Sequence, residues 1–203
     1  MDVTRSVYRQ LLICVAEQYL GGTECFALLV SAVCHDVGHP GLNYPFMVEV
    51  SHELALKSND RSPLEYMHGA KLFEIVGNPK TDIFFRFIEA ILHTDMPDHV
   101  SMVKETQVLY GRNSEIFDAT RELYYEDPNE FPTKEAVEHF RASQDTKRLI
   151  RNLFLHTGDV SNPMKPFKVC RIWPGKCWRS SSSRGTRRRS SASRCRCWTT
   201  GTR

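Results

Sequence analysis

Long apolar runs are missing from this sequence of 203 residues. The longest, from Cys25 to Cys34, is ten residues, whereas a membrane-spanning helix needs about 20. The opening Met1-Asp2 is followed by neither the basic region nor the apolar stretch of a secretory leader. The sequence therefore predicts no membrane span and no export.

Disulfide-type cysteine spacing is also missing. Seven cysteines are present, and Cys14, Cys25 and Cys34 lie among apolar residues with helical spacing. Buried, reduced thiols are typical of proteins in a reducing compartment. We therefore expect a cytoplasmic protein.

Acidic residues are absent from the last part of the chain. Residues 171–203 contain ten Lys or Arg and no Asp or Glu, so the net charge of +3 hides a body of 17 basic and 24 acidic residues, a net of −7. From Pro174 onward Ser, Arg, Cys, Trp and Thr dominate, a composition that predicts disorder. Such a tail is either an RNA-binding arm or unselected translated sequence, and we favour the second interpretation. The expected domains are 1–173 and the tail 174–203.

Strand-type alternation of apolar and polar residues is not evident, and helical periodicity dominates instead. The sequence predicts an all-α protein. The expected helices are 7–20, 24–33, 62–76, 81–93, 133–140 and 144–155.

Several helix boundaries carry specific signals. Thr23, Ser62 and Thr133 are expected N-caps. Ser62 is followed by Pro63 at the first helical position and by Glu65 at the third, the pattern of a capping box.

The segment HDVGHPG, residues 35–41, follows an apolar helix. The adjacent His35 and Asp36 can bring an imidazole nitrogen and a carboxylate oxygen to one divalent metal ion. His39 stays near the same place and can hydrogen-bond a water held there. Taken alone, a His-Asp pair is more often a polar helix end than a metal site.

Other polar residues allow similar pairs of interpretations. Asp159 lies at the end of the apolar helix that is expected over 144–155, and it offers a second carboxylate. Taken alone, an Asp in this position more often helps to terminate the helix. Glu65 is either a capping residue or part of a site. Asp95 and Met96 could belong to a site, but they fit equally well as a surface turn and a core side chain, respectively.

Together these segments resemble the class I cyclic-nucleotide phosphodiesterases, an all-α branch of the HD metal-dependent phosphohydrolases. The resemblance covers about residues 2–173 and keeps the family's order. Its motifs are DVTRSVYRQLL, HDVGHPGLN, SHELALKSNDRSPLEYMHGAKLF, HTDM and HTGDVSNPMKP.

The resemblance implies a compact multi-helix bundle that hydrolyses a 3′,5′-cyclic nucleotide to the 5′-monophosphate in signal transduction. A hydroxide activated by two divalent ions, usually Zn²⁺ with Mg²⁺ or Mn²⁺, would attack the phosphate. By resemblance, the first ion is held by His35, Asp36 and Asp159, of which Asp36 also bridges to the second. Waters on the second ion are held by His39, Glu65 and Thr94, with His68 beside them. The resemblance also implies four substrate-binding residues: Met96 and Asn162, which line the nucleotide pocket, and Asp36 and Asp159.

The sequence departs from the family in several places. The family's first metal ligand and its acid His lie in an HNxxH motif that ends just before the equivalent of Asp2, and no His precedes His35. We therefore expect a truncated bundle that is inactive alone, with regulatory domains upstream in a longer protein. Tyr44 replaces a usual Asn, and Gly38 replaces an often acidic residue.

The tail also departs from the family, which continues with a helix reading roughly LEEFF. Shifting the reading frame after about Pro174 permits that segment, so we expect residues 174–203 to be out of frame.

Two other functions compete with this interpretation. One is another HD-type phosphohydrolase, such as a nucleotidase, which shares the His-Asp pair and the distal Asp. The other is a non-catalytic product with a nucleic-acid-binding basic tail. The SHELAL, LEYMH and HTDM segments favour the phosphodiesterase, so a cyclic nucleotide is the expected partner and nucleic acid is not.

Overall fold

The computed structural model describes residues 2–77, 82–127 and 130–172. These residues form twelve α-helices and two short 3₁₀ helices, and no β-strand lies among them, which confirms the all-α prediction. The expected disordered, out-of-frame tail at 174–203 lies outside the described residues. The chain divides into one unit at Met1–Asp159 and another at Val160–Arg203.

The first expected helix is divided in two. The structure has α1 at Asp2–Ile13 and α2 at Glu17–Leu20. Val15 between them has a φ of 47°, a left-handed conformation that a β-branched residue rarely adopts. The prediction of one helix over 7–20 was wrong because the apolar spacing continues across a break in the backbone.

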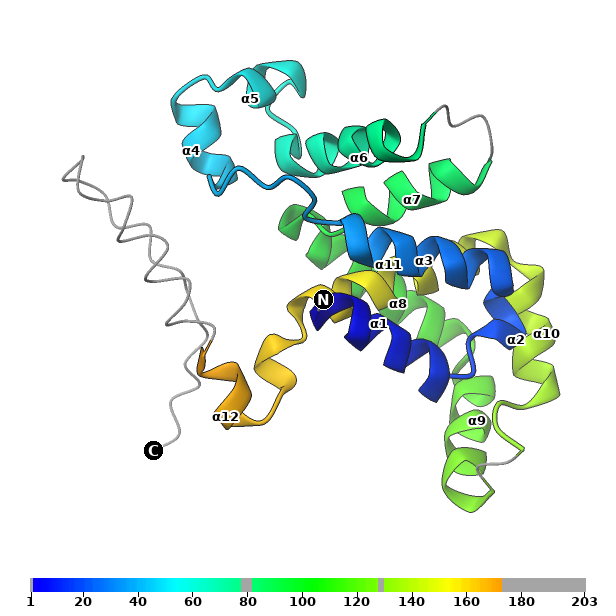
Figure 1. Cartoon of the computed structure of the whole chain (residues 1–203). Helices are drawn as coiled ribbons and strands as arrows, with labels where there is room; N and C mark the ends of the chain where they lie inside the picture. Colours follow the sequence, from blue (N-terminus) through cyan, green and yellow to red (C-terminus); the bar gives the residue numbers. More distant parts are fainter. Residues whose placement is uncertain (1, 78–81, 128–129, 173–203) are drawn as a thin grey trace. The chain divides into compact units, whose positions relative to one another are not determined.

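Helix α3, Gly22–Cys34, is central in the first unit. It packs against α1, α7 (Asp82–Leu92) and α6 (Pro63–Val76) (Figure 1). One side contributes Leu28 to a core with Val7 and Leu155, and another contributes Ala27 to a core with Phe87 and Ile91. Burial on these two sides explains most of the apolar residues of the helix, although Phe26 and Val33 are exposed.

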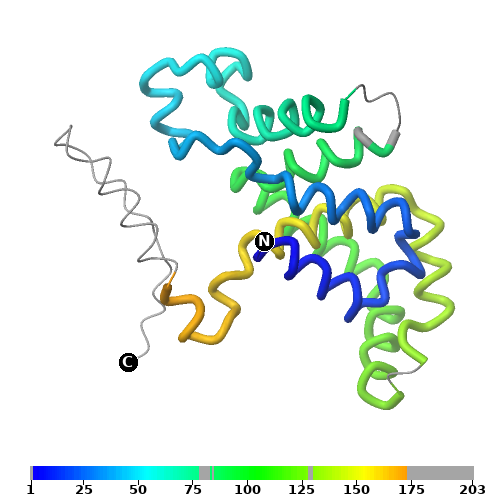
Figure 2. The backbone as a smooth tube through the Cα atoms, viewed as in Figure 1, coloured from blue at the N-terminus to red at the C-terminus, as the bar shows by residue number. Residues whose placement is uncertain are grey.

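The chain leaves α3 through a loop and enters two short helices, α4 at Tyr44–Glu49 and α5 at Glu53–Lys57. They share a small core of Met47, Ala55 and Leu64 with the start of α6. After α7 the chain forms α8 (His99–Arg112), α9 (Ser114–Glu126) and α10 (Lys134–Ala142). The cyan part of the trace and the green α9 occupy different ends of the first unit (Figure 2). The sequence did not predict α4, α5, α8 or α9.

The N-cap predictions had mixed outcomes. Thr133 caps α10, since its hydroxyl accepts from the Ala136 amide at 3.2 Å, as predicted. The prediction of Thr23 is wrong, because α3 begins at Gly22, two residues earlier than expected, and its N-cap is Gly21, with a φ of 84°. Ser62 precedes α6 but makes no capping hydrogen bond through its side chain.

Helix α11, Gln144–Val160, is longer than the expected 144–155. Its last turns pass close to α1: a Cβ built on Gly158 would lie 2.7 Å from a Val7 methyl carbon. The absence of a side chain at Gly158 therefore permits this approach. Because α11 continues to Val160, Asp159 lies within its last turn.

A buried ion network joins α11 to α3 and α7. Arg151, 3% exposed, donates to Glu24 at 3.3 Å and to Glu89 at 2.6 Å. Glu24, also buried, is paired with Arg86 as well.

In the second unit, the described residues form a 3₁₀ turn at Asn162–Met164 and the short α12 at Phe167–Cys170. Among all helices of the described ranges, none combines the length and apolarity needed to cross a bilayer.

Candidate metal centre

His35 directly follows α3 and is largely buried, with its side chain 12% exposed. Its Nδ1 lies 2.9 Å from the Ala32 carbonyl oxygen, so Nδ1 carries the proton and donates. The lone pair of Nε2 then faces two carboxylates, Asp36 Oδ2 at 3.7 Å and Asp159 Oδ1 at 3.6 Å. The end of α3 and the end of α11 thus bring three potential metal ligands together.

His68 on α6 lies on the other side of the same aspartate. Its side chain is 2% exposed, and its Nδ1 donates to the Val37 carbonyl at 2.8 Å. Its Nε2 lies 3.7 Å from Asp36 Oδ1. The two oxygens of Asp36 therefore face two different imidazoles, that of His35 and that of His68.

His39 is in the opposite tautomer to His35 and His68. The Gly41 amide donates to its Nδ1 at 2.9 Å, so in the neutral ring the proton is on Nε2. Its ring stacks on that of His68 with centroids 5.6 Å apart. The nearest donor atoms of Asp36, His39 and His68 lie within 4.8 Å of one another. Protein hydrogen bonding thus leaves His39 an N–H donor and His68 a lone-pair donor.

The imidazole nitrogens and carboxylate oxygens of this region are spaced as ligands of a divalent cation, and not as direct hydrogen-bond partners of one another. Separations of 3.6–3.7 Å exceed hydrogen-bond lengths. Two ligands at 2.0–2.2 Å from one tetrahedral ion are about 3.3–3.6 Å apart. Imidazoles whose Nδ1 is fixed by a backbone carbonyl are also typical of metal ligands. Among the described residues, the group formed by Asp36, His39 and His68 therefore suits a metal ion.

The carboxylates dominate the electrostatics of His35. Burial lowers its pKa, but the close Asp159 carboxylate and the negative charges of Asp36 and Asp159 outweigh burial, so the pKa is raised above its usual value. At His68 burial prevails over the favourable Val37 and Asp36 interactions, so the pKa is lowered. His68 is therefore kept neutral, the form that binds cations.

Glu65 and Thr94 come from neighbouring elements. Burial, and then the charges of Asp95, Asp36 and Asp159, raise the pKa of Glu65 to about 7. Thr94, also buried, donates its hydroxyl to the Ile91 carbonyl at 2.7 Å. Burial is the largest of these causes, so Glu65 is an acid that holds its proton more tightly than an exposed carboxyl.

Two contacts in this region were missed by sequence reasoning. The Ser62 hydroxyl donates to Asp95 Oδ2 at 2.7 Å, which connects the start of α6 to the residue after Thr94. The Tyr44 hydroxyl donates to the Asp60 carbonyl at 2.7 Å, which connects α4 to the turn before α6. No short motif signals either contact, because each joins two separate segments.

Comparison with known proteins gives the family. The model of the 3′5′-cyclic nucleotide phosphodiesterase family matches residues 1–194. The chain belongs to this family. This phosphodiesterase chain is 30% identical over 184 residues to the 3′,5′-cyclic-nucleotide phosphodiesterase regA of Dictyostelium discoideum, covering 85% of the chain and 20% of that relative.

Two further similar proteins are also phosphodiesterases. The high affinity cGMP-specific 3′,5′-cyclic phosphodiesterase 9A of Homo sapiens is 27% identical over 172 residues, covering 84% of the chain and 26% of the relative. The crystal structure of the phosphodiesterase domain of Salpingoeca rosetta rhodopsin phosphodiesterase matches with a TM-score of 0.65 and 28% identity, covering 90% of the chain and 52% of that domain. The phosphodiesterase chain thus spans about a fifth to a quarter of these curated relatives and half of the solved domain.

The two residues expected to line the nucleotide pocket, Met96 and Asn162, belong to different units. Met96 lies in the 3₁₀ turn Met96–Asp98 and is 60% exposed. Asn162 begins the 3₁₀ turn of the second unit. The substrate-binding roles of both in the phosphodiesterase stay predictions, as do the metal roles of His35, Asp36 and Asp159.

Proposed function

We propose that this chain supplies a two-metal centre for hydrolysis of a 3′,5′-cyclic nucleotide, cyclic AMP or cyclic GMP, to the 5′-monophosphate. The observation that carries the proposal is the position of Asp36, whose two carboxylate oxygens face His35 Nε2 and His68 Nε2, each at 3.7 Å. A carboxylate placed in this way can bridge two cations.

The residues divide into two sets. His35, Asp36 and Asp159 would hold the first ion, proposed to be Zn²⁺, through one imidazole and two carboxylates. The second, proposed to be Mg²⁺ or Mn²⁺, would take Asp36 directly. Two such ions, when bound, make a nearby water acidic and neutralise charge on the phosphate.

His39, Glu65 and Thr94 would orient water around the second ion. His39 offers an N–H because Gly41 already occupies its Nδ1 lone pair. Glu65, with a pKa of about 7, can exchange a proton near neutral pH, the range in which a general acid or base is most effective. Thr94 has its proton engaged with Ile91, so its oxygen remains an acceptor.

We further propose that residues 1–203 alone turn over slowly or not at all, because no histidine precedes His35 to act as the acid. General acid assistance is worth about 10²–10⁴ in rate. The function is therefore tested first by metal binding and then by catalysis in a longer protein, made by extending this chain upstream through an HNxxH motif.

Calorimetric titration of the chain with Zn²⁺ or Mn²⁺ should show binding that Asp36→Ala removes and the control Asp118→Ala, on α9, retains. In the longer protein, His35→Ala and Asp159→Ala should abolish hydrolysis of cyclic AMP and cyclic GMP. A folded, metal-loaded protein that is inert towards both nucleotides would refute the proposal and favour another HD-type phosphohydrolase.

A further inference from the structure

A cavity of about 750 Å³ lies on the outer side of α6, between α5 and the loop at Gly38 and Pro40. None of the residues assigned to the metal centre lines it. Its size is within the range of about 300–1,000 Å³ that small-molecule sites occupy. The cavity is therefore large enough for a ligand distinct from the substrate.

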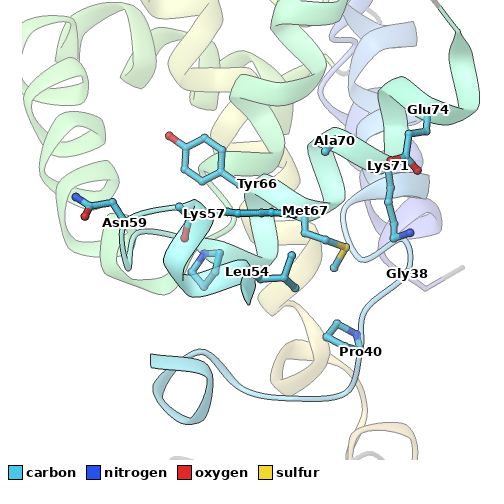
Figure 3. A pocket seen from close by; sticks show the side chains of 12 residues that line it. Gly38, Pro40, Leu54, Lys57, Asn59, Tyr66, Met67, Ala70, Lys71 and Glu74 are labelled. Atoms are coloured by element: carbon cyan, nitrogen blue, oxygen red, sulfur yellow. The ribbon is translucent and has the colours of Figure 1, made fainter. Parts of the chain in front are cut away.

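The floor of the cavity is apolar. Leu54 and Met67 extend into it from α5 and α6, and Pro40 closes it from the loop (Figure 3). Ala70 lies on the same face of α6, one turn beyond Met67. A methionine in such a position adapts its shape to different apolar ligands.

A cation lies at the edge of this floor. The Lys71 side chain runs from α6 to Gly38 (Figure 3); a Cβ built on Gly38 would be 2.4 Å from Lys71 Cδ and 3.5 Å from its Nζ. Glu74 also lines the cavity, but within the ranges that the structure describes neither it nor another carboxylate forms an ion pair with this ammonium group. By contrast, Lys57, which also lines the cavity, is paired with Glu53 at 2.6 Å.

We propose that this cavity is a binding site for a small organic anion with an apolar body, whose charged group pairs with Lys71. The apolar body would cover Leu54, Met67 and Ala70. The source of such an anion is either an aliphatic acid or an aromatic one, and both share this chemistry.

The site also adjoins the proposed metal centre. Gly38 and Pro40, which line the cavity, are the two neighbours of His39 in the chain. Gly38 has a φ of 71°, so the backbone at this turn is set in a conformation that few other residues adopt. A ligand held by Lys71 would contact the turn on both sides of His39 and alter the position of that imidazole. This regulatory consequence rests on the proposed function, whereas the binding site does not.

Calorimetric titration of the full chain with decanoate, 1-naphthoate and decylammonium tests the site. We expect one decanoate or naphthoate per chain, with a Kd of about 1 mM or lower, and at least tenfold weaker binding of decylammonium. The stronger of the two anions identifies the source as aliphatic or aromatic. Equal binding of decanoate and decylammonium, or no binding of either anion, overturns the proposal.

Two variant pairs locate the site. Lys71→Gln should weaken anion binding at least tenfold, whereas Lys104→Gln, on α8, should not. Ala70→Phe fills the cavity and should abolish binding, whereas Ala119→Phe, at an exposed position of α9, should retain it. Circular dichroism confirms that each variant is folded. Unchanged affinity in folded Ala70→Phe contradicts the assignment.

The coupling to His39 has a separate readout. The His39 ring signals in a ¹H–¹³C spectrum, assigned with His39→Gln, should shift when decanoate binds, while those of His139 on α10 should not. Binding without a shift of His39 leaves the site and refutes its coupling to the metal centre. Loss of catalysis in the longer protein would not affect either measurement.

Discussion

Replacement of Arg151 by Met removes the centre of the buried ion network. The change leaves Glu24, 6% exposed, with Arg86 as its remaining ion-pair partner among the described residues. Glu89, whose side chain is 32% exposed, keeps an ion pair with Arg148 at 3.9 Å as its only other one within the described ranges. Met restores much of the lost volume, so the variant isolates the charge.

The expected loss in the free energy of unfolding follows from this arrangement of charges. Removing one partner of a buried ion pair costs about 3–5 kcal/mol. Because Glu24 keeps Arg86 and Glu89 is partly solvated, we expect a loss of about 2–4 kcal/mol in the free energy of unfolding. For a domain of this size the melting temperature should fall by about 5–15 °C.

Urea unfolding followed by circular dichroism measures this loss. Arg148→Met, one turn earlier on α11 and 48% exposed, is the matched control and should cost less than about 1 kcal/mol. The double variant with Glu24→Gln should be more stable than the sum of the single changes predicts, by at least about 1 kcal/mol. If Arg151→Met is as stable as the Arg148 control, the network does not stabilise the fold.

Three further predictions concern α6 and α11. Gly158→Ala should destabilise the protein, because its Cβ would lie 2.7 Å from a Val7 methyl carbon, and Val7→Ala should restore part of the loss in the double variant; thermal melts without such rescue would contradict the close approach. Ser62→Ala and Ser62→Gly both lose the bond to Asp95, but Ser62 has a φ of 43°, so Gly should be the more stable of the two by about 1 kcal/mol, and the reverse order in urea unfolding would be inconsistent with this conformation. The pKa of Glu65 is raised by burial to about 7 in the folded chain, so without metal the stability it contributes is present below about pH 4.5 and lost as pH rises towards 7; Glu65→Gln should therefore stabilise the protein more at pH 8 than at pH 5, and an equal effect at both would contradict the shift.

Much of the fold was predictable because local signals agreed with packing. Helix α6 was expected to end near Val76, and it does, before the positive φ of Gly77. Thr133 was an effective N-cap signal because its hydroxyl meets the Ala136 amide within one turn. Such interactions involve residues three apart, which sequence patterns describe well.

The rest depended on distant contacts. The break at Val15 cannot be inferred from apolar spacing, since Leu11 and Leu20 are buried on both sides of it. Ser62 looked like a cap because its partner, Asp95, is 33 residues away.

The candidate site was predictable in composition but not in geometry. His35, Asp36 and Asp159 were chosen from motifs, and the structure brings them within 4 Å through His35. The tautomers could not be predicted, since they depend on the Ala32 and Val37 carbonyls and on the Gly41 amide.

Helix α11 carries both Arg151, fixed in the core, and Asp159, directed at His35. Eight residues separate them, which corresponds to about 12 Å along the axis and just over two turns. Inserting or deleting a single residue in this interval would rotate Asp159 by about 100° around the axis while leaving every side chain of the site present. The helical spacing therefore sets both the distance and the direction of Asp159 relative to Arg151. Between these two residues the number of residues is constrained more strictly than their identity.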